Sequence, residues 1–201
     1  MIYKLHDIIP QNINLSDGDL ILHQISLDDI FLIWKFQGKN NFINESCRPV
    51  SNRKDQEEKE FYKSVLKNKN VFIFGIYHSD NVDKAIGQIA LSDFNCRNRS
   101  SEIGYSLMSE YQKRGYMRRC ISVLNSFIFT KTPMNKIYAQ TGEFNKSSIN
   151  LLKQLHFHCD GHLREHHELD GILYEDYLFS LTRNDWLKYA ELRNFPFFNT
   201  L

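Results

Sequence analysis

The sequence predicts one α+β domain in which helices flank a mostly antiparallel central sheet of about seven strands. Segments of strand character and segments with apolar residues at helical spacing follow one another in the order β-α-α-β-β-β-α-β-α-β-β. Three of the strands are consecutive, which is typical of an antiparallel meander. The chain has 201 residues, enough for a single domain with its own core, and it shows no internal repeat.

The first half of the chain supplies one strand, two helices and the meander. Residues 19–25 (DLILHQI) have strand character, and Ser26 is placed to cap a helix over 27–36. A polar stretch leads to a second amphipathic helical segment over 53–68. The three consecutive strands are expected at residues 71–77, 85–91 and 101–107.

The second half supplies a long amphipathic helix and the remaining strands. Apolar residues at helical spacing run from Met117 to Thr130, and Pro133 lies beyond the end of that helix. A strand is expected next, then a helix, then a hairpin that ends in the final strand. These elements fall at residues 136–141, 145–155 and 171–181.

Composition limits the partners and the compartment. Lys and Arg number 25 and Asp and Glu number 24, so the formal net charge is +1 and we expect neither a nucleic-acid nor a membrane partner. No apolar run approaches the ~18 residues of a membrane span. There is no CxxC spacing and no segment of signal-peptide type, which predicts a cytoplasmic protein. The four cysteines are Cys47, Cys96, Cys120 and Cys159.

The segment SEYQKRGYM places two cations and a glycine where a helix begins. Gln112, Lys113 and Arg114 directly precede Gly115, and the amphipathic pattern follows. Exposed N–H groups at a helix start, together with the helix dipole and nearby cations, bind phosphate oxygens. Glycine lets such a ligand approach the main chain. The alternative interpretation is a basic, solvated turn that only caps the helix.

This segment resembles the pyrophosphate loop of the GNAT superfamily of acetyl-CoA-dependent N-acetyltransferases, [QR]-x-x-G-x-[GA]. The closer likeness is to the branch that contains ribosomal-protein N-terminal acetyltransferases, and it covers about residues 20–186. Its landmarks follow in order as IGQIALSDFNCRNRSSEIGYSL, EYQKRGYM, NKIYAQTGEFNKSSINLLKQLHF and GHLREHHELDGILYEDYLFSLTRNDW. The expected domain is 20–183, after an N-terminal extension (1–19) and before a C-terminal helix and tail packed on the domain (184–201).

The resemblance implies that acetyl-CoA is the cosubstrate and that its pyrophosphate lies on this loop. The implied contacts are Gln112, Lys113, Arg114, Gly115, Tyr116 and Met117. Met117 departs from the small residue of the pattern, and the loop is bulkier and more basic than usual. Arg114, Arg118 and Arg119 either contact coenzyme phosphates or form an exposed cationic helix start, and for Arg119 we favour the surface interpretation.

The resemblance also implies direct transfer, in which an amine attacks the thioester carbon without a metal or a covalent enzyme intermediate. A main-chain N–H near Leu107 would hold the thioester oxygen, while the pantetheine arm pairs with that strand. In NKSS, Asn145 would bind the pantetheine amides and Ser148 would face the sulfur. Many relatives use a tyrosine where Leu152 stands here. Asn145 and Ser148 also fit an ordinary helix cap.

A proton acceptor for the amine is expected on the strand SEIGYSL. Alternation places Glu102 on one strand face with Gly104 and Ser106, where its carboxylate could take the amine proton. Glu143, just before Asn145, competes for the role. The alternative is that Glu102 is a solvated strand residue.

The segment HFHCDGHLREHH is rich in zinc-ligand side chains, but no metal site is expected there. No pair has HExxH or CxxC spacing, and strand alternation divides the side chains between two sheet faces. The residues concerned are His156, His158, Cys159, His162, His166 and His167.

Three functions remain open from the sequence. The first is acetylation of a protein N-terminus, and the second is acetylation of a small amine such as an amino sugar, aminoglycoside or polyamine. The third is a non-catalytic, acetyl-CoA-binding regulatory protein. A homodimer is also left open.

Overall fold

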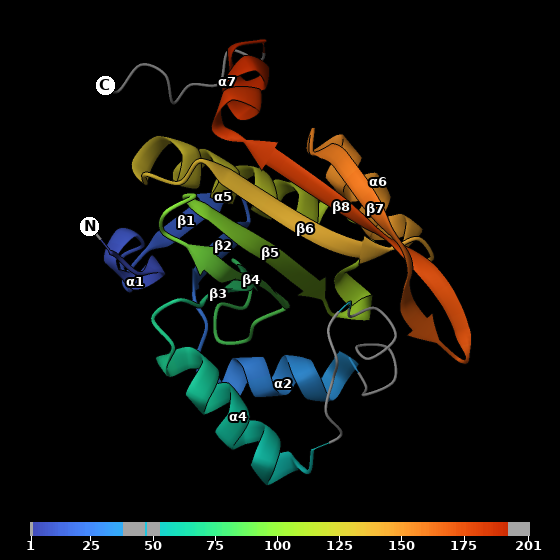
Figure 1. Cartoon of the computed structure of the whole chain (residues 1–201). Coiled ribbons are helices and arrows are strands. Elements are labelled where there is room, and N and C mark those ends of the chain that lie inside the picture. The colour runs from blue at the N-terminus through green and yellow to red at the C-terminus, as the bar shows by residue number, and fades with distance from the viewer. Residues whose placement is uncertain (1, 38–46, 48–52, 193–201) are drawn as a thin grey trace.

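The computed structural model describes residues 2–37, 47 and 53–192, and its strands form one eight-stranded sheet (Figure 1). The order across the sheet is β1-β2-β3-β4-β5-β6-β8-β7. The strands are β1 Asn14–Asp17, β2 Leu20–Gln24, β3 Phe72–His78, β4 Gly87–Asn95, β5 Ser100–Leu107, β6 Lys136–Gly142, β7 His158–Leu169 and β8 Ile172–Thr182. The helices are α1 Leu5–Ile8, α2 Leu27–Gln37, α4 Asp55–Lys67, α5 Tyr116–Lys131, α6 Lys146–Gln154 and α7 Arg183–Leu192, with a 3-10 turn, η1, at Ser109–Tyr111.

The predicted fold class is confirmed, and all seven predicted strands are present in the predicted order. The additional strand β1 lies within residues 1–19, the predicted extension, and pairs antiparallel with β2. Its sequence NLSD is only four residues long and no position in it is buried, so it carries no apolar alternation. The helix α1 was also not predicted, because its four residues are too few to show a helical period.

Each sheet face carries its own helices. Phe72, Phe74 and Ile76 of β3 belong to the core that includes residues of α5 and α6, whereas Ile73 and Tyr77 pack in a cluster with α2 and α4. We call these the α5 face and the α2 face. Figure 1 shows α2 and α4 side by side next to the meander strands. Alternate strand residues therefore decide which face a side chain joins.

The pairing of β5 with β6 is the one parallel pairing among the described strands, and it is short. It joins Ser100–Glu102 to Lys136–Tyr138 only. Beyond that point β5 continues to Leu107 beside β4, and β6 continues to Gly142 beside β8. The two strands therefore leave an unpaired stretch between them, which we call the β5–β6 gap. An extended ligand can pair with such an edge.

None of the helices within residues 2–37 and 53–192 combines the length and the apolar character needed to cross a membrane.

Candidate active site

The start of α5 has the geometry of an anion site. Gly115 is the N-cap, with φ of 77° in the left-handed region, and its side chain position is open, since nothing lies within 4 Å of an added Cβ. No side chain caps the helix, and the first intrahelical bond is Arg119 N–H to Gly115 O at 3.2 Å. The N–H groups of Tyr116, Met117 and Arg118 therefore precede the hydrogen-bonded ladder and can bind a ligand.

The other loop residues divide into those that hold the loop and those that face outward. Gln112 Nε2 donates to Leu107 O at 3.0 Å and so ties the loop to the end of β5. Lys113 is exposed and has φ of 60°. Met117 is buried in the core, so this bulky side chain stays clear of the phosphate path and can contribute only through its backbone.

Arg119 points away from this loop start. Its guanidinium pairs with Asp17 at 3.0 Å and with Asp19 at 2.7 Å, which connects α5 to the β1–β2 turn. The hydrogen bond from Arg119 lowers the pKa of the Asp19 carboxyl. Arg119 is therefore occupied in a structural contact rather than directed toward a coenzyme, and only about a third of its side chain is exposed.

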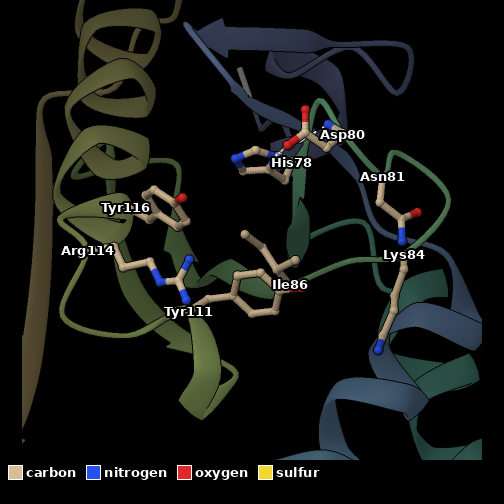
Figure 2. A pocket seen from close by; sticks show the side chains of 8 residues that line it. All are labelled: His78, Asp80, Asn81, Lys84, Ile86, Tyr111, Arg114 and Tyr116. Atoms are coloured by element: carbon tan, nitrogen blue, oxygen red, sulfur yellow. Dashed lines mark hydrogen bonds and ion pairs between the residues drawn. The ribbon is translucent and has the colours of Figure 1, made fainter.

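A cavity of about 210 Å³ adjoins the loop. Figure 2 shows Arg114 and Tyr116 on the α5 side of this cavity, facing the β3–β4 turn that carries Asn81 and Lys84. The Arg114 guanidinium lies 5.8 Å from the centre of the Tyr111 ring. Of the cations that line the cavity, Arg114 lies beside the helix start, where it suits a phosphate group, whereas Lys84 lies across the cavity with its ammonium 4.7 Å from the centre of the Phe36 ring.

The edge of β5 presents main-chain donors to the gap. Arg99 O accepts from Lys136 N on the β6 side at 3.1 Å, whereas Met108 N donates to Ile86 O on the β4 side at 2.9 Å. Since backbone groups alternate sides along a strand, Tyr105 and Leu107 direct their N–H groups into the β5–β6 gap. This orientation fits the role expected for the Leu107 N–H.

The predicted residue Ser148 lies on the α5 face beside the gap. Its Oγ is 2.9 Å from the Tyr105 hydroxyl, and burial raises the pKa of Tyr105 to about 12. Asn145 caps α6, because its Oδ1 accepts from Ser148 N at 3.1 Å and from Ser147 Oγ at 2.8 Å. The capping role thus belongs to Asn145, and the Ser148 hydroxyl is directed to Tyr105 instead. The sequence did not single out Tyr105.

Two substitutions of Asn145 separate its capping role from coenzyme binding. Asn145→Ala should lower the free energy of unfolding by about 1 kcal/mol, since the α6 cap is lost. Asn145→Asp keeps the capping oxygen and should preserve stability, but it removes the amide N–H groups. If those groups bind pantetheine, both variants weaken acetyl-CoA binding in calorimetry. Unchanged acetyl-CoA affinity in both variants would show that Asn145 caps α6 and does not bind pantetheine.

The two candidate carboxylates occupy different environments. Glu102 is half-buried and shares a face with its register partner Tyr138, the α2 face. Glu143 Oε1 accepts from Glu175 N at 3.1 Å, and Glu143 N donates to Glu175 O at 2.9 Å. Glu143 thereby fastens the end of β6 to β8.

The structure also brings together three side chains that the sequence pattern separated. One ligand-type atom from each of Cys47, His167 and Asp176 lies within 4.8 Å of the other two. These are side-chain types that could hold a metal ion. Of the histidine-rich segment only His167 takes part, whereas His158 and His162 pair with nearby carboxylates at the surface. No spacing rule could have found a set that spans residues 47 to 176.

Comparison with known proteins agrees with this architecture. A model of the acetyltransferase (GNAT) domain matches residues 19–158, so the chain belongs to the GNAT acetyltransferase family.

Named relatives of this chain are N-acetyltransferases. The uncharacterized N-acetyltransferase p20 of Bacillus licheniformis is 31% identical over 104 residues, which span 52% of this chain and only 58% of p20. The ribosomal protein uS5 alanine N-acetyltransferase of Escherichia coli is 27% identical over 184 residues, 87% of this chain and 93% of that protein.

A solved structure shows the same fold. The spermidine N-acetyltransferase from Vibrio cholerae, in complex with CoA and spermine, has a TM-score of 0.76 at 20% identity. The match covers 85% of this chain and 99% of that one.

Proposed function

We propose that the protein is an acetyl-CoA-dependent N-acetyltransferase that transfers an acetyl group to a primary amine by direct attack on the thioester. One observation carries the proposal: the unpaired edge of β5 lies between an open helix start at Gly115 and the Ser148–Tyr105 hydroxyl pair. Along this edge, a phosphate site is followed by a strand edge for pantetheine and then by a hydrogen-bond donor for the leaving sulfur. We assign the activity to residues 20–183 and to the cytoplasm.

The coenzyme side of the mechanism uses groups on the loop and on the α5 face. The pyrophosphate accepts hydrogen bonds from the N–H groups at the start of α5, with Lys113 and Arg114 nearby. Pantetheine pairs with β5, and Leu107 N–H stabilises the oxyanion that forms on the thioester oxygen. Ser148 donates to the departing sulfur, and the partly buried Tyr105 phenol stays protonated and supports that hydroxyl.

The amine enters from the α2 face, where Glu102 lies. An ammonium group is not a nucleophile, so one proton has to leave before attack. Glu102 attracts the ammonium and carries or relays that proton. The amine lone pair then forms the new C–N bond at the thioester carbon, and the carbonyl electron pair moves to oxygen to give the tetrahedral oxyanion. When the oxyanion collapses, the C–S bond breaks and its electron pair leaves on sulfur. The nitrogen loses its second proton, and the thiolate, hydrogen-bonded to Ser148, gains a proton to give coenzyme A.

We propose a protein N-terminus as the acceptor, because the uS5 alanine N-acetyltransferase matches over most of both chains. A polyamine is the second candidate, since the spermidine acetyltransferase has the same fold.

The test of this function is consumption of acetyl-CoA in the presence of N-terminal peptides, polyamines and amino sugars in parallel. We expect amine-dependent release of coenzyme A that is greatest with peptides. Faster turnover with polyamines than with peptides would make a polyamine, and not a protein N-terminus, the acceptor. Tight acetyl-CoA binding without turnover on any amine would instead favour the regulatory alternative.

A further inference from the structure

We propose that Cys47, His167 and Asp176 form a binding site for one zinc ion. One ligand-type atom of each side chain lies within 4.8 Å of the other two. Cys47 lies between α2 and α4 in the sequence, whereas the other two residues belong to the β7–β8 hairpin. A bound ion would therefore cross-link two distant parts of the chain. This inference goes beyond the proposed acetyl transfer and does not depend on it.

The distance between the imidazole and the carboxylate fits two ligands of one metal ion. His167 Nδ1 lies 3.4 Å from Asp176 Oδ1, beyond the usual roughly 2.7–3.2 Å of an N–H···O hydrogen bond. Zinc bonds of about 2.0–2.2 Å at tetrahedral angles place a nitrogen and an oxygen ligand about 3.3–3.5 Å apart. The two atoms are therefore already spaced like two corners of a zinc tetrahedron.

The sulfur of Cys47 needs only a small movement to complete this set. A zinc–sulfur bond of about 2.3 Å puts the sulfur about 3.6 Å from a nitrogen or oxygen ligand. The separations in the structure are at most 4.8 Å, so the sulfur has to approach by no more than about 1.2 Å. The main chain of Gly142, the register partner of Asp176, hydrogen-bonds this sulfur and favours its thiolate form. The end of β6 thus holds the sulfur beside the other two ligands.

Asp176 gives an independent indication that the cluster takes a cation. Its side chain is fully buried, and Oδ1 has no hydrogen-bond partner among the described residues. Its Oδ2 accepts from Gln140 Nε2 at 2.6 Å, and hydrogen bonds of this kind orient carboxylates that bind metals. A buried carboxylate oxygen without a donor is costly, and buried charges are normally paired or bound to a metal ion. A zinc ion would satisfy Oδ1.

A β-bulge brings the histidine to this carboxylate. Leu163 is the register partner of Asp176. In a regular strand Tyr174 would then oppose Glu165, but its observed partner is His167. The shift adds two residues to β7, and φ of Glu165 within it is 50°. Bulges redirect side chains and are common beside functional sites. This one places an imidazole, instead of a second carboxylate, next to Asp176.

The donor set matches zinc in kind and in charge. Thiolate, imidazole and carboxylate are the usual protein ligands of zinc, and a set of three leaves the fourth tetrahedral position to water. Without a metal, burial and then the charge of Asp176 raise the pKa of the Cys47 thiol to about 12. As the sulfur–zinc bond forms, the S–H proton leaves to solvent, while the imidazole binds as the neutral ring. The two charges of the ion then balance the thiolate and the carboxylate.

The test is zinc binding by the tag-free, chelator-treated protein, measured by calorimetry and metal analysis without acetyl-CoA or an amine. We expect one zinc per chain. The thermal midpoint should rise by about 5–10 °C when free zinc is 100 times Kd, because the ion binds only the folded chain. Each variant that removes one ligand should weaken zinc binding at least about 10-fold: Cys47→Ser, His167→Gln and Asp176→Asn.

Three further variants separate this site from binding at the surface. Gln140→Leu removes the hydrogen bond that orients the carboxylate and should weaken zinc binding about 10- to 100-fold. Cys159→Ser and His166→Gln replace exposed side chains of β7 and should bind zinc like the wild type. Zinc bound equally by the wild type and all three ligand variants, or lost only in Cys159→Ser, would contradict the proposal.

X-ray absorption spectroscopy on the zinc-loaded wild type keeps the test decisive if a ligand variant does not fold. We expect one sulfur neighbour at about 2.3 Å and nitrogen or oxygen neighbours at about 2.0–2.2 Å, also in Cys159→Ser. A zinc shell without sulfur, or a wild type that binds no zinc, would overturn the proposal. Since neither acetyl-CoA nor an amine is present, none of these outcomes depends on the proposed acetyl transfer.

Discussion

Replacing Ser148 by alanine is expected to lower kcat about 10- to 1000-fold while acetyl-CoA affinity stays nearly unchanged. The hydroxyl acts mainly as negative charge develops on sulfur. Its loss therefore raises the free energy of the transition state more than it weakens coenzyme binding. Leu152, one turn further along α6, cannot replace the hydroxyl, because it is apolar and buried in the core. Steady-state kinetics and calorimetry on the same preparation measure both quantities.

Two further variants sharpen the assignment of Ser148. Ser147→Ala, on the neighbouring position of α6, removes an exposed hydroxyl that donates to the cap residue Asn145 and should retain wild-type kcat. Tyr105→Phe removes the partner of Ser148 and should give an intermediate loss. A Ser148→Ala protein with full turnover and a lowered thermal midpoint would reject the catalytic role.

Replacing Gly115 by valine is expected to weaken acetyl-CoA binding at least about 10-fold, the scale of one lost hydrogen bond to a charged group. The β-branched side chain would fill the open space over the N–H groups at the start of α5. A non-glycine residue in the left-handed region also costs about 1–3 kcal/mol of stability, so binding and folding have to be measured separately.

Gly171 supplies a matched control for this strain. It has the same φ of 77° and an equally open side-chain position, but it lies in the β7–β8 turn. Gly171→Val should therefore lose comparable stability and keep its affinity for acetyl-CoA. If calorimetry gives Gly115→Val and the wild type the same affinity for acetyl-CoA, the coenzyme does not bind on this loop.

The parts that the sequence could predict are local. The helix start at Gly115 can be predicted from consecutive residues, because a glycine, two cations and an amphipathic pattern all lie next to one another in the chain. Asn145 and Ser148 are one helical turn apart, so their placement at the start of α6 also follows from spacing. The β5–β6 gap was implied only by the family likeness.

The parts that the sequence could not predict depend on contacts between distant segments. The face of Tyr105 follows from strand alternation, but nothing near it indicates that Ser148, on another element, would meet it. The sequence favours an exposed Arg119 at the surface, because β1 has no apolar alternation and gives no sign that Asp17 and Asp19 pair with this side chain. His167 and Asp176 meet through a bulge that shifts the β7–β8 register, and Cys47 joins them from a different part of the chain.

A structure of the protein with bound acetyl-CoA tests the central claim most directly. We expect the pyrophosphate on the N–H groups at the start of α5, pantetheine paired with β5 in the β5–β6 gap, and the thioester oxygen on Leu107 N–H. We also expect the sulfur within hydrogen-bonding distance of Ser148 Oγ on the α5 face. A coenzyme bound outside the gap, or a sulfur directed to the α2 face away from Ser148, would contradict it.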